Sequence, residues 1–269
     1  MTLRIIYEPR GRALEYAPLA VSLYRGCPHG CVYCFAPAST KTEREKFLQP
    51  YARKDALAKL AMDCADLKKA GDEREILLSF TTDPYQPLEE GTNLTRKAII
   101  VLCRYGRPFT ILTKGGLLSS RDFDWLGNYK DLARYGTTLV FSNEKDRVLW
   151  EPLAAPTRER IAALELAHHY GIRTWVSLEP VIYPVQSLFM ITATFPFVDE
   201  YRIGKFNHTK DNPALEKFIE SIGYVYPTDQ EWTEFVQQAY TLLKFYKKEF
   251  VFKKDLQPYL PIAQAWGKV

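Results

Sequence analysis

Short apolar runs alternate with predicted helices along most of the chain. Six of these runs have the composition of buried strands, and they span residues 19–24, 76–80, 109–114, 138–143, 173–178 and 200–204. The segments between them predict helices over residues 54–69, 94–105, 120–133 and 158–170. Strands that alternate with helices in this way are typical of βα units in a parallel sheet. The pattern therefore predicts an α/β fold with six parallel strands.

The two ends of the chain depart from this alternation. Residues 1–18 contain two prolines and three arginines, so we expect an irregular lead-in there. Residues 228–248 have the apolar spacing of one long helix. No repeat or low-complexity tract is visible, so we predict a single domain over residues 1–269. Its parts are the lead-in, a barrel core over residues 19–210 and a helical extension over residues 211–269.

Lysines alternate with aromatic residues near the C-terminus, over residues 244–254. Basic and aromatic residues together can follow phosphates and stack on bases. The same segment is equally compatible with a helix and strand that close the side of the barrel and keep a solvated charged face. Both interpretations stay open at this point.

Composition and charge are those of an ordinary globular protein. The net charge is +4, from 36 basic and 32 acidic residues, which only weakly favours a polyanionic partner such as nucleic acid. The N-terminus has no long apolar segment, and no apolar run reaches the length of a membrane span. We therefore expect a cytoplasmic protein without membrane contact. A barrel covered by helices can be monomeric, and we expect a monomer.

Three of the five cysteines lie within eight residues, as Cys27, Cys31 and Cys34 in a loop that follows the first strand. Three thiolates can hold three irons of a cubane cluster, which normally takes four cysteines. The missing fourth ligand leaves one iron open for chemistry. A zinc site would need a fourth ligand such as His29 or His208, and no second pair of cysteines is present. Cys64 and Cys103 fall on apolar helix faces and are predicted to be core residues.

The spacing Cys-x3-Cys-x-aromatic-Cys, with Tyr33 as the aromatic residue, resembles the cluster loop of the radical S-adenosylmethionine (SAM) superfamily. The flanking residues, Tyr24–Cys27 and Cys34–Ala36, resemble its spore photoproduct lyase-like or "DNA repair photolyase" branch. The resemblance implies a partial (β/α)6 TIM-type barrel that carries a [4Fe-4S] cluster on Cys27, Cys31 and Cys34. It also implies that the open iron binds SAM and that cleavage of SAM yields a 5′-deoxyadenosyl radical, which abstracts hydrogen from a substrate.

Polar residues at the ends of the later strands resemble further motifs of this branch. The cofactor-binding residues that the resemblance implies are Tyr33, Thr81, Thr82, Asp83, Lys114, Ser142 and Ser177. The catalytic candidates are Tyr33, Tyr85, Glu179, Lys205 and Asn207. A simple Asp-Pro turn is the alternative for Tyr85, and a solvated strand end is the alternative for Lys114.

Two departures from the branch concern the reaction. Spore photoproduct lyases use a cysteine as hydrogen donor where this chain has Phe80, and a tyrosine where it has Phe35. We therefore expect a photolyase-like enzyme that is not a true spore photoproduct lyase. Nucleic acid or a nucleotide is the expected substrate, and an electron donor such as flavodoxin or ferredoxin is the expected partner. The alternatives are a peptide or small-metabolite substrate, or a non-catalytic regulatory protein that binds an iron–sulfur cluster or zinc.

Overall fold

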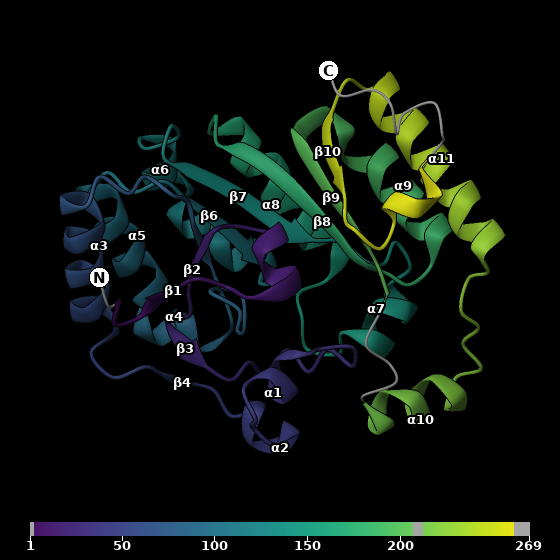
Figure 1. Ribbon diagram of the computed structural model, residues 1–269, viewed down its shortest axis with the longest axis horizontal. Helices are drawn as coiled ribbons and strands as arrows, with labels where there is room; N and C mark the ends of the chain where they lie inside the picture. The colour runs from purple at the N-terminus through teal and green to yellow at the C-terminus, as the bar shows by residue number, and fades with distance from the viewer. Residues whose placement is uncertain (1–2, 207–211, 261–269) are drawn as a thin grey trace.

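The computed structural model describes residues 3–206 and 212–260, and one twisted sheet forms its centre (Figure 1). The sheet has eight strands in the order β1-β2-β5-β6-β7-β8-β9-β10. Six of them form the predicted parallel series, which confirms the α/β fold of partial-barrel type. They are β2 (Leu19–Val21), β5 (Ile76–Leu78), β6 (Phe109–Thr113), β7 (Ala133–Thr138), β8 (Arg173–Val181) and β9 (Glu200–Lys205).

Two further strands border these six. The strand β1 (Ile6–Tyr7) pairs antiparallel with β2, and β10 (Glu249–Phe252) pairs parallel with β9. The C-terminal extension therefore contains the strand β10 besides α10 (Pro213–Ser221) and α11 (Asp229–Phe245), which agrees with the helix-and-strand alternative left open for residues 244–254.

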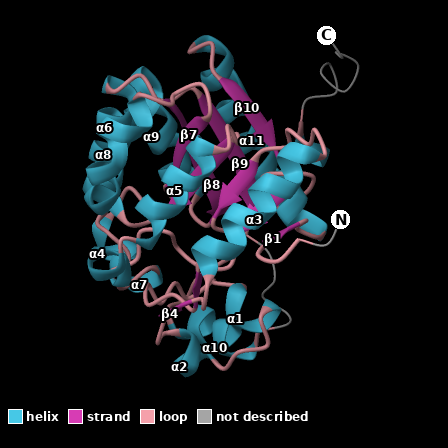
Figure 2. Cartoon of the chain, turned by 90° about the vertical axis from the view of Figure 1, so that its left-hand side faces the viewer, coloured by secondary structure: helices cyan, strands magenta, loops and turns pink. Residues whose placement is uncertain are grey.

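Helices surround the strands, as Figure 2 shows from the side. The predicted long helices are observed as α3 (Ala56–Lys69), α5 (Leu94–Arg104) and α8 (Thr157–His169). Cys64 and Cys103 are buried in the core, as predicted. Near the end of the sheet, α9 (Pro184–Thr194) packs against α11. The shorter elements are α1 (Ala36–Ser39), α2 (Arg44–Phe47), α4 (Leu88–Thr92), α6 (Phe123–Gly127), α7 (Glu144–Trp150) and the antiparallel pair β3 (Tyr24–Arg25) and β4 (Tyr51–Ala52).

The fourth parallel strand lies earlier than the predicted range 138–143. It is β7, and the apolar run 139–141 that suggested a strand is a buried connection beyond it. Gly136 of β7 provides space for Trp175 of β8, because a Cβ at Gly136 would lie 2.2 Å from Cε2 of the indole. A strand that contains a glycine and ends in threonines lacks the apolar run that marks a buried strand. The helix predicted over 120–133 is accordingly reduced to α6.

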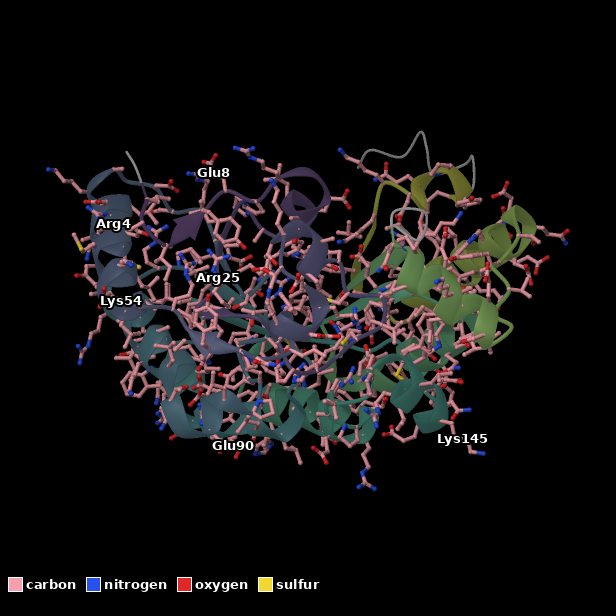
Figure 3. All side chains as sticks on the ribbon, turned by 90° about the horizontal axis from the view of Figure 1, so that it is seen from below. Arg4, Glu8, Arg25, Lys54, Glu90 and Lys145 are labelled. Carbon is pink, nitrogen blue, oxygen red and sulfur yellow. The ribbon has the colours of Figure 1, made fainter. Side chains whose placement is uncertain are left out.

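The N-terminal segment, predicted as an irregular lead-in, is attached firmly to the rest of the fold. The carboxylate of Asp63 on α3 accepts hydrogen bonds from the backbone N–H groups of residues 4–6, at 2.7–3.0 Å. The Arg4 guanidinium adds an ion pair to the same carboxylate at 3.2 Å. Arg4 lies at one end of the molecule and Lys145 at the other (Figure 3). Across residues 3–206 and 212–260, every helix is too short or too polar to span a bilayer.

Candidate functional site

A cavity of about 700 Å³ lies where the parallel strands end. Its wall combines residues that follow β5 and β6, the end of β9, the segment after β10, the cysteine loop and the N-terminal segment. Parallel strands bring their carboxyl ends to one edge, where barrel enzymes place their sites. The cavity is lined by Cys27, Cys31 and Cys34 together with Tyr33, Thr81, Thr82, Asp83, Lys114, Glu179 and Lys205, all of which the sequence singled out.

The cysteine loop is held by backbone contacts from two sides. The N–H of Cys27 donates to the carbonyl of Phe47 at 2.8 Å, and Arg44 donates to the carbonyl of Cys31 at 2.8 Å. Gly26 allows this close approach, since it has a φ of +78° and a Cβ there would lie 2.5 Å from the Phe47 oxygen. The loop therefore presents three thiols to the cavity from a fixed backbone.

The three cysteines have the chemistry of cluster ligands. Burial raises the pKa of Cys31 to about 12 and raises the pKa values of Cys27 and Cys34, so the isolated thiols are neutral. Metal coordination deprotonates such thiols. Within residues 3–206 and 212–260, no three His, Cys, Asp or Glu side chains converge on a single ion. In a cubane each thiolate binds its own iron, so the sulfurs need not meet at one point. The donor set fits a [4Fe-4S] cluster.

Asp83 connects the segment after β5 to the end of β6. Its carboxylate accepts hydrogen bonds from the Tyr85 N–H at 2.8 Å, the Thr113 hydroxyl at 2.6 Å and the Lys114 N–H at 2.7 Å. His29 lies 3.5 Å from the same carboxylate. We predicted that Asp83 contacts the cofactor directly. Both carboxylate oxygens accept hydrogen bonds from the protein and Asp83 also lines the cavity, so its contact with a cofactor stays a prediction.

Lys114 is a half-buried cation beside the cysteine loop. Its ammonium lies 5.6 Å from the centre of the Tyr33 ring. Burial opposes the charged form, but the nearby Cys31 and Glu151 outweigh this effect, and the pKa of Lys114 is raised. A charged ammonium in a cavity wall is suited to hold the carboxylate of a ligand.

Tyr33 lines the cavity, but its hydroxyl faces the protein interior. It donates to the buried carboxylate of Glu151, which also pairs with Arg160 at 2.6 Å. Burial, and then the charge of Glu151, raise the pKa of the Tyr33 phenol, so the phenol stays protonated. Neither Glu151 nor Arg160 was predicted as a site residue, because both follow the fourth strand at a distance and match no motif.

Two threonines join β5 to the start of the cysteine loop. The Thr82 hydroxyl donates to the Gly26 carbonyl at 2.5 Å, and the Thr81 hydroxyl lies 3.1 Å from that of Ser22. Both threonines line the cavity as predicted. Thr82 therefore positions the loop, because its hydrogen already has an acceptor.

Glu179 belongs to a polar cluster that the sequence did not reveal. Its carboxylate accepts a hydrogen bond from Tyr16 of the N-terminal segment and pairs with Lys253, which follows β10. The Lys253 ammonium lies 3.3 Å from the centre of the Tyr16 ring. Ser177 stands behind this cluster, since its hydroxyl lies 3.1 Å from that of Tyr16 and the residue does not line the cavity. β1 and β10 are the two end strands of the sheet, and the segments that follow them bring Tyr16 and Lys253 to Glu179.

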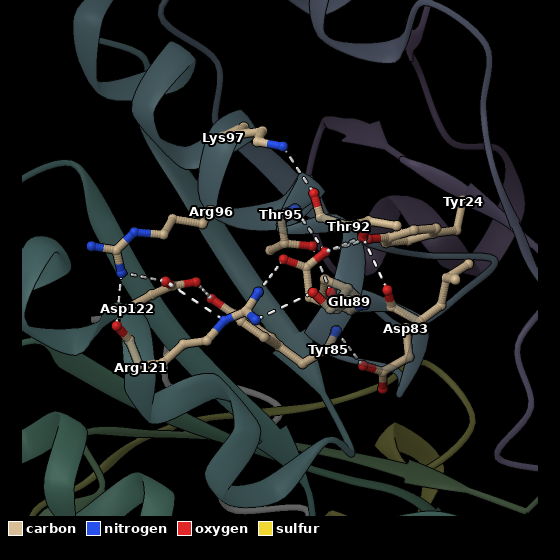
Figure 4. A network of polar contacts seen from close by, with 12 residues as sticks. Tyr24, Asp83, Tyr85, Glu89, Thr92, Thr95, Arg96, Lys97, Arg121 and Asp122 are labelled. Carbon is tan, nitrogen blue, oxygen red and sulfur yellow. Dashed lines mark hydrogen bonds and ion pairs between the residues drawn. The ribbon is translucent and has the colours of Figure 1, made fainter.

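Besides Ser177, two further predicted site residues lie outside the cavity. Tyr85 is buried, and its hydroxyl donates to Asp122 at 2.9 Å, inside a network that includes Arg96 (Figure 4). The Ser142 N–H donates to Gln186 at 2.8 Å, because β7 ends earlier than predicted and leaves Ser142 beyond the strand. Asn207 and His208 lie outside the described residues.

Lys205 ends β9 and lines the cavity. Its ammonium donates to the Tyr259 hydroxyl at 2.9 Å, and Tyr259 donates in turn to Asp229 at 2.6 Å. Lys205 is thus connected to the C-terminal segment, which the sequence analysis treated as an extension.

The protein family of this chain follows from its match to a family model. The family model of the radical SAM superfamily matches residues 21–195, which include the cysteine loop, Lys114 and Glu179. The chain belongs to the radical SAM superfamily. Members of the superfamily generally bind SAM and an iron–sulfur cluster, which agrees with the three cysteines in the cavity.

This radical SAM protein is similar to three uncharacterised proteins of archaeal, viral and bacterial origin. The chain is 24% identical over 206 residues to MJ0683 of Methanocaldococcus jannaschii, which covers 76% of each protein. It is 27% identical over 178 residues to ORF301 of Acidianus two-tailed virus, which covers 61% of this chain and 56% of the viral protein. The match to Rv2578c of Mycobacterium tuberculosis is 34% over 116 residues and spans 33% of that protein.

Solved structures share the fold of this radical SAM protein. Spore photoproduct lyase in complex with a dinucleoside spore photoproduct matches with a TM-score of 0.71 at 15% identity, over 94% of this chain and 80% of the lyase. Streptococcus suis SuiB bound to S-adenosylmethionine matches with a TM-score of 0.65 at 11% identity, over 90% of this chain and 52% of SuiB. At these identities the likeness concerns the fold alone.

Proposed function

We propose that this radical SAM protein is an enzyme that uses a [4Fe-4S] cluster on Cys27, Cys31 and Cys34 to act on nucleic acid or a nucleotide. When bound, the cluster and SAM supply a 5′-deoxyadenosyl radical that abstracts hydrogen from the substrate. The observation that carries the proposal is that three cysteines from one loop and the Lys114 ammonium line the same cavity.

In this proposal, different residues of the cavity wall contact the cofactor and the substrate. Lys114 holds the SAM carboxylate, while Thr81 and the ring of Tyr33 form the adjoining wall. Glu179, with Tyr16 and Lys253, provides a polar surface that can accept and donate hydrogen bonds to a substrate. The enclosing residues exclude water, which protects a reactive intermediate from side reactions.

The rest of the wall suits a nucleotide. Tyr16, Phe35 and Phe80 offer aromatic rings, and Arg10, Lys205 and Lys253 offer positive charge. Aromatic and basic side chains together bind bases and phosphates. We further propose a small one-electron carrier such as flavodoxin or ferredoxin as the partner that reduces the cluster.

Anaerobic SAM cleavage tests this proposal. The protein is reconstituted with iron and sulfide, reduced with dithionite and mixed with SAM, and 5′-deoxyadenosine is quantified beside a Cys31→Ala control. We expect product in the wild type alone, and more of it when a nucleic acid substrate is added. Stimulation by a peptide or a small metabolite but not by nucleic acid would refute the substrate class and retain the enzyme. A cluster EPR signal that SAM leaves unchanged, with no product, would refute the enzyme.

A further inference from the structure

One wall of the cavity is a continuous aromatic surface. The ring centres of Phe35 and Phe80 lie 5.2 Å apart, and those of Phe80 and Tyr16 lie 5.8 Å apart. All three residues line the cavity, and we call them the aromatic wall. They come from the segment after the third cysteine, the end of β5 and the N-terminal segment, so only the tertiary fold assembles them.

Tyr16 and Phe80 pack with one side against a buried core cluster, whereas Phe35 belongs to no core cluster of the described residues. Phe35 is 42% exposed, although it directly follows Cys34. By contrast, Phe109 and Phe123 of the barrel are fully buried. Apolar rings that remain accessible in a concave site are typical of surfaces that bind a ligand. Because Cys34 and Phe35 are neighbours in the chain and both line the cavity, a ligand on the wall lies beside the cysteine loop.

Unpaired hydroxyl groups accompany the aromatic wall. Ser79 is only 4% exposed and lines the cavity, and its hydroxyl makes no hydrogen bond within the described part of the chain. Tyr7 on β1 also lines the cavity, and its hydroxyl makes no hydrogen bond within the described residues. A buried hydroxyl without a partner destabilises the protein, and a ligand that bonds it removes that cost.

Positive charge lies at the edge of the same region. Arg10 is exposed and lines the cavity between Tyr7 and Tyr16 in the chain. A guanidinium at the rim is suited to a phosphate, which it binds through two parallel hydrogen bonds.

We propose that the aromatic wall is a stacking subsite for one base of single-stranded nucleic acid. The Ser79 hydroxyl bonds the edge of that base, and Arg10 contacts a neighbouring phosphate. This inference rests on the proposed function and adds the position and chemical form of its substrate. Stacking on aromatic rings is the common way in which proteins hold unpaired bases, and it tolerates different base identities.

Oligonucleotide binding tests the subsite without relying on turnover. The reconstituted holoprotein, with SAM present, is titrated anaerobically with a fluorescein-labelled oligothymidylate, and affinity is measured by fluorescence anisotropy. We expect Phe80→Ala to weaken binding about five- to hundredfold, the range for the loss of one base–aromatic stack. Phe80→Trp should retain binding, because it keeps a stacking surface. Phe189→Ala is the matched control, since Phe189 is 57% exposed on α9 and does not line the cavity.

Salt dependence tests the role of Arg10. The affinity of a single strand falls with salt by a slope of about 0.7 per phosphate contacted. Arg10→Gln should lower the slope by about this amount, and Lys145→Gln should leave it unchanged. Equal affinity of Phe80→Ala and Phe189→Ala, or no binding of the oligonucleotide, would overturn the subsite. If 5′-deoxyadenosine still forms in that case, the radical SAM chemistry stands and only the base subsite fails. Iron content and circular dichroism of each variant identify those that fail to fold.

Discussion

The Tyr16 hydroxyl donates a hydrogen bond to the Glu179 carboxylate, across a separation of 163 residues. Lys253 pairs with the same carboxylate, and Arg202 donates to the Tyr16 carbonyl. One carboxylate on β8 therefore joins the N-terminal segment to the segment after β10. Residues from both ends of the chain thereby become part of the cavity wall.

Replacement of Tyr16 by phenylalanine removes the donor and leaves the partly buried carboxylate with one partner fewer. We expect the free energy of unfolding to fall by about 1–3 kcal/mol, as for loss of a hydrogen bond to a charged group. Urea denaturation of the anaerobic protein measures it. Tyr51→Phe is the control, because Tyr51 is 62% exposed, and it should change stability by no more than about 0.5 kcal/mol. Equal effects of the two variants would show that the Tyr16–Glu179 bond does not stabilise the fold.

The positions of the five cysteines predict which of them bind iron. Cys31→Ala should reduce the iron content well below about four per chain and abolish the absorption of the cluster. Cys103→Ala should keep both, since Cys103 is buried in the core outside the cavity. Iron and sulfide analysis after reconstitution measures the difference. Loss of iron in Cys103→Ala while its circular dichroism is unchanged would contradict the assignment of the ligands.

The Lys114 ammonium should determine the affinity for SAM. Lys114→Met removes one charge-assisted contact to the SAM carboxylate, and we expect binding to weaken about tenfold to a hundredfold. Equilibrium dialysis of the reconstituted protein with labelled SAM measures it. Lys145→Met is the control, since Lys145 is exposed on α7 and should bind SAM as the wild type does. Unchanged affinity in Lys114→Met would place the SAM carboxylate elsewhere.

Glu151 makes stability depend on acid pH. Burial disfavours its charge, but Arg160 and Lys114 outweigh this and lower the pKa of Glu151 below its ordinary value of 4.5. A carboxylate with a lowered pKa stabilises the folded state above its unfolded pKa, and this contribution is lost as the pH falls through the folded value. Glu151→Gln should therefore be less stable at neutral pH and lose less stability on acidification. Denaturation of the wild type and of Glu151→Gln between neutral pH and pH 3 measures both effects. An equal loss of stability in the two proteins on acidification would refute this role of Glu151.

Substitution by alanine should destabilise the fold at Gly136 and stabilise it at Gly91. A Cβ at Gly136 would meet the Trp175 indole, which is buried and donates to Thr110 at 2.8 Å. Overpacking of this kind destabilises by about 1–3 kcal/mol. Gly91 lies in α4 with no atom within 4 Å of its Cβ position, so alanine should stabilise by about 0.5–1 kcal/mol. Thermal unfolding compares the two variants, and stabilisation by Gly136→Ala would be the contrary result.

The sequence alone predicted the parallel βα series and the cysteine loop, because both are local patterns. Helices such as α3 and α8 carry their periodicity in consecutive residues, and the three cysteines lie within eight residues. Lys114, Thr81 and Thr82 were predicted for the same reason, since each directly follows a recognisable strand.

Only the tertiary structure placed the residues whose surroundings come from distant parts of the chain. Ser142 and Tyr85 were assigned to the site by their positions after strands, but Gln186 and Asp122 hold them elsewhere. Tyr16 and Lys253 carry no local signal, because their role exists only when β1 and β10 complete the sheet around Glu179. Periodicity reports which face of an element is buried, whereas the partners of a polar side chain depend on elements that the chain brings together only when it folds.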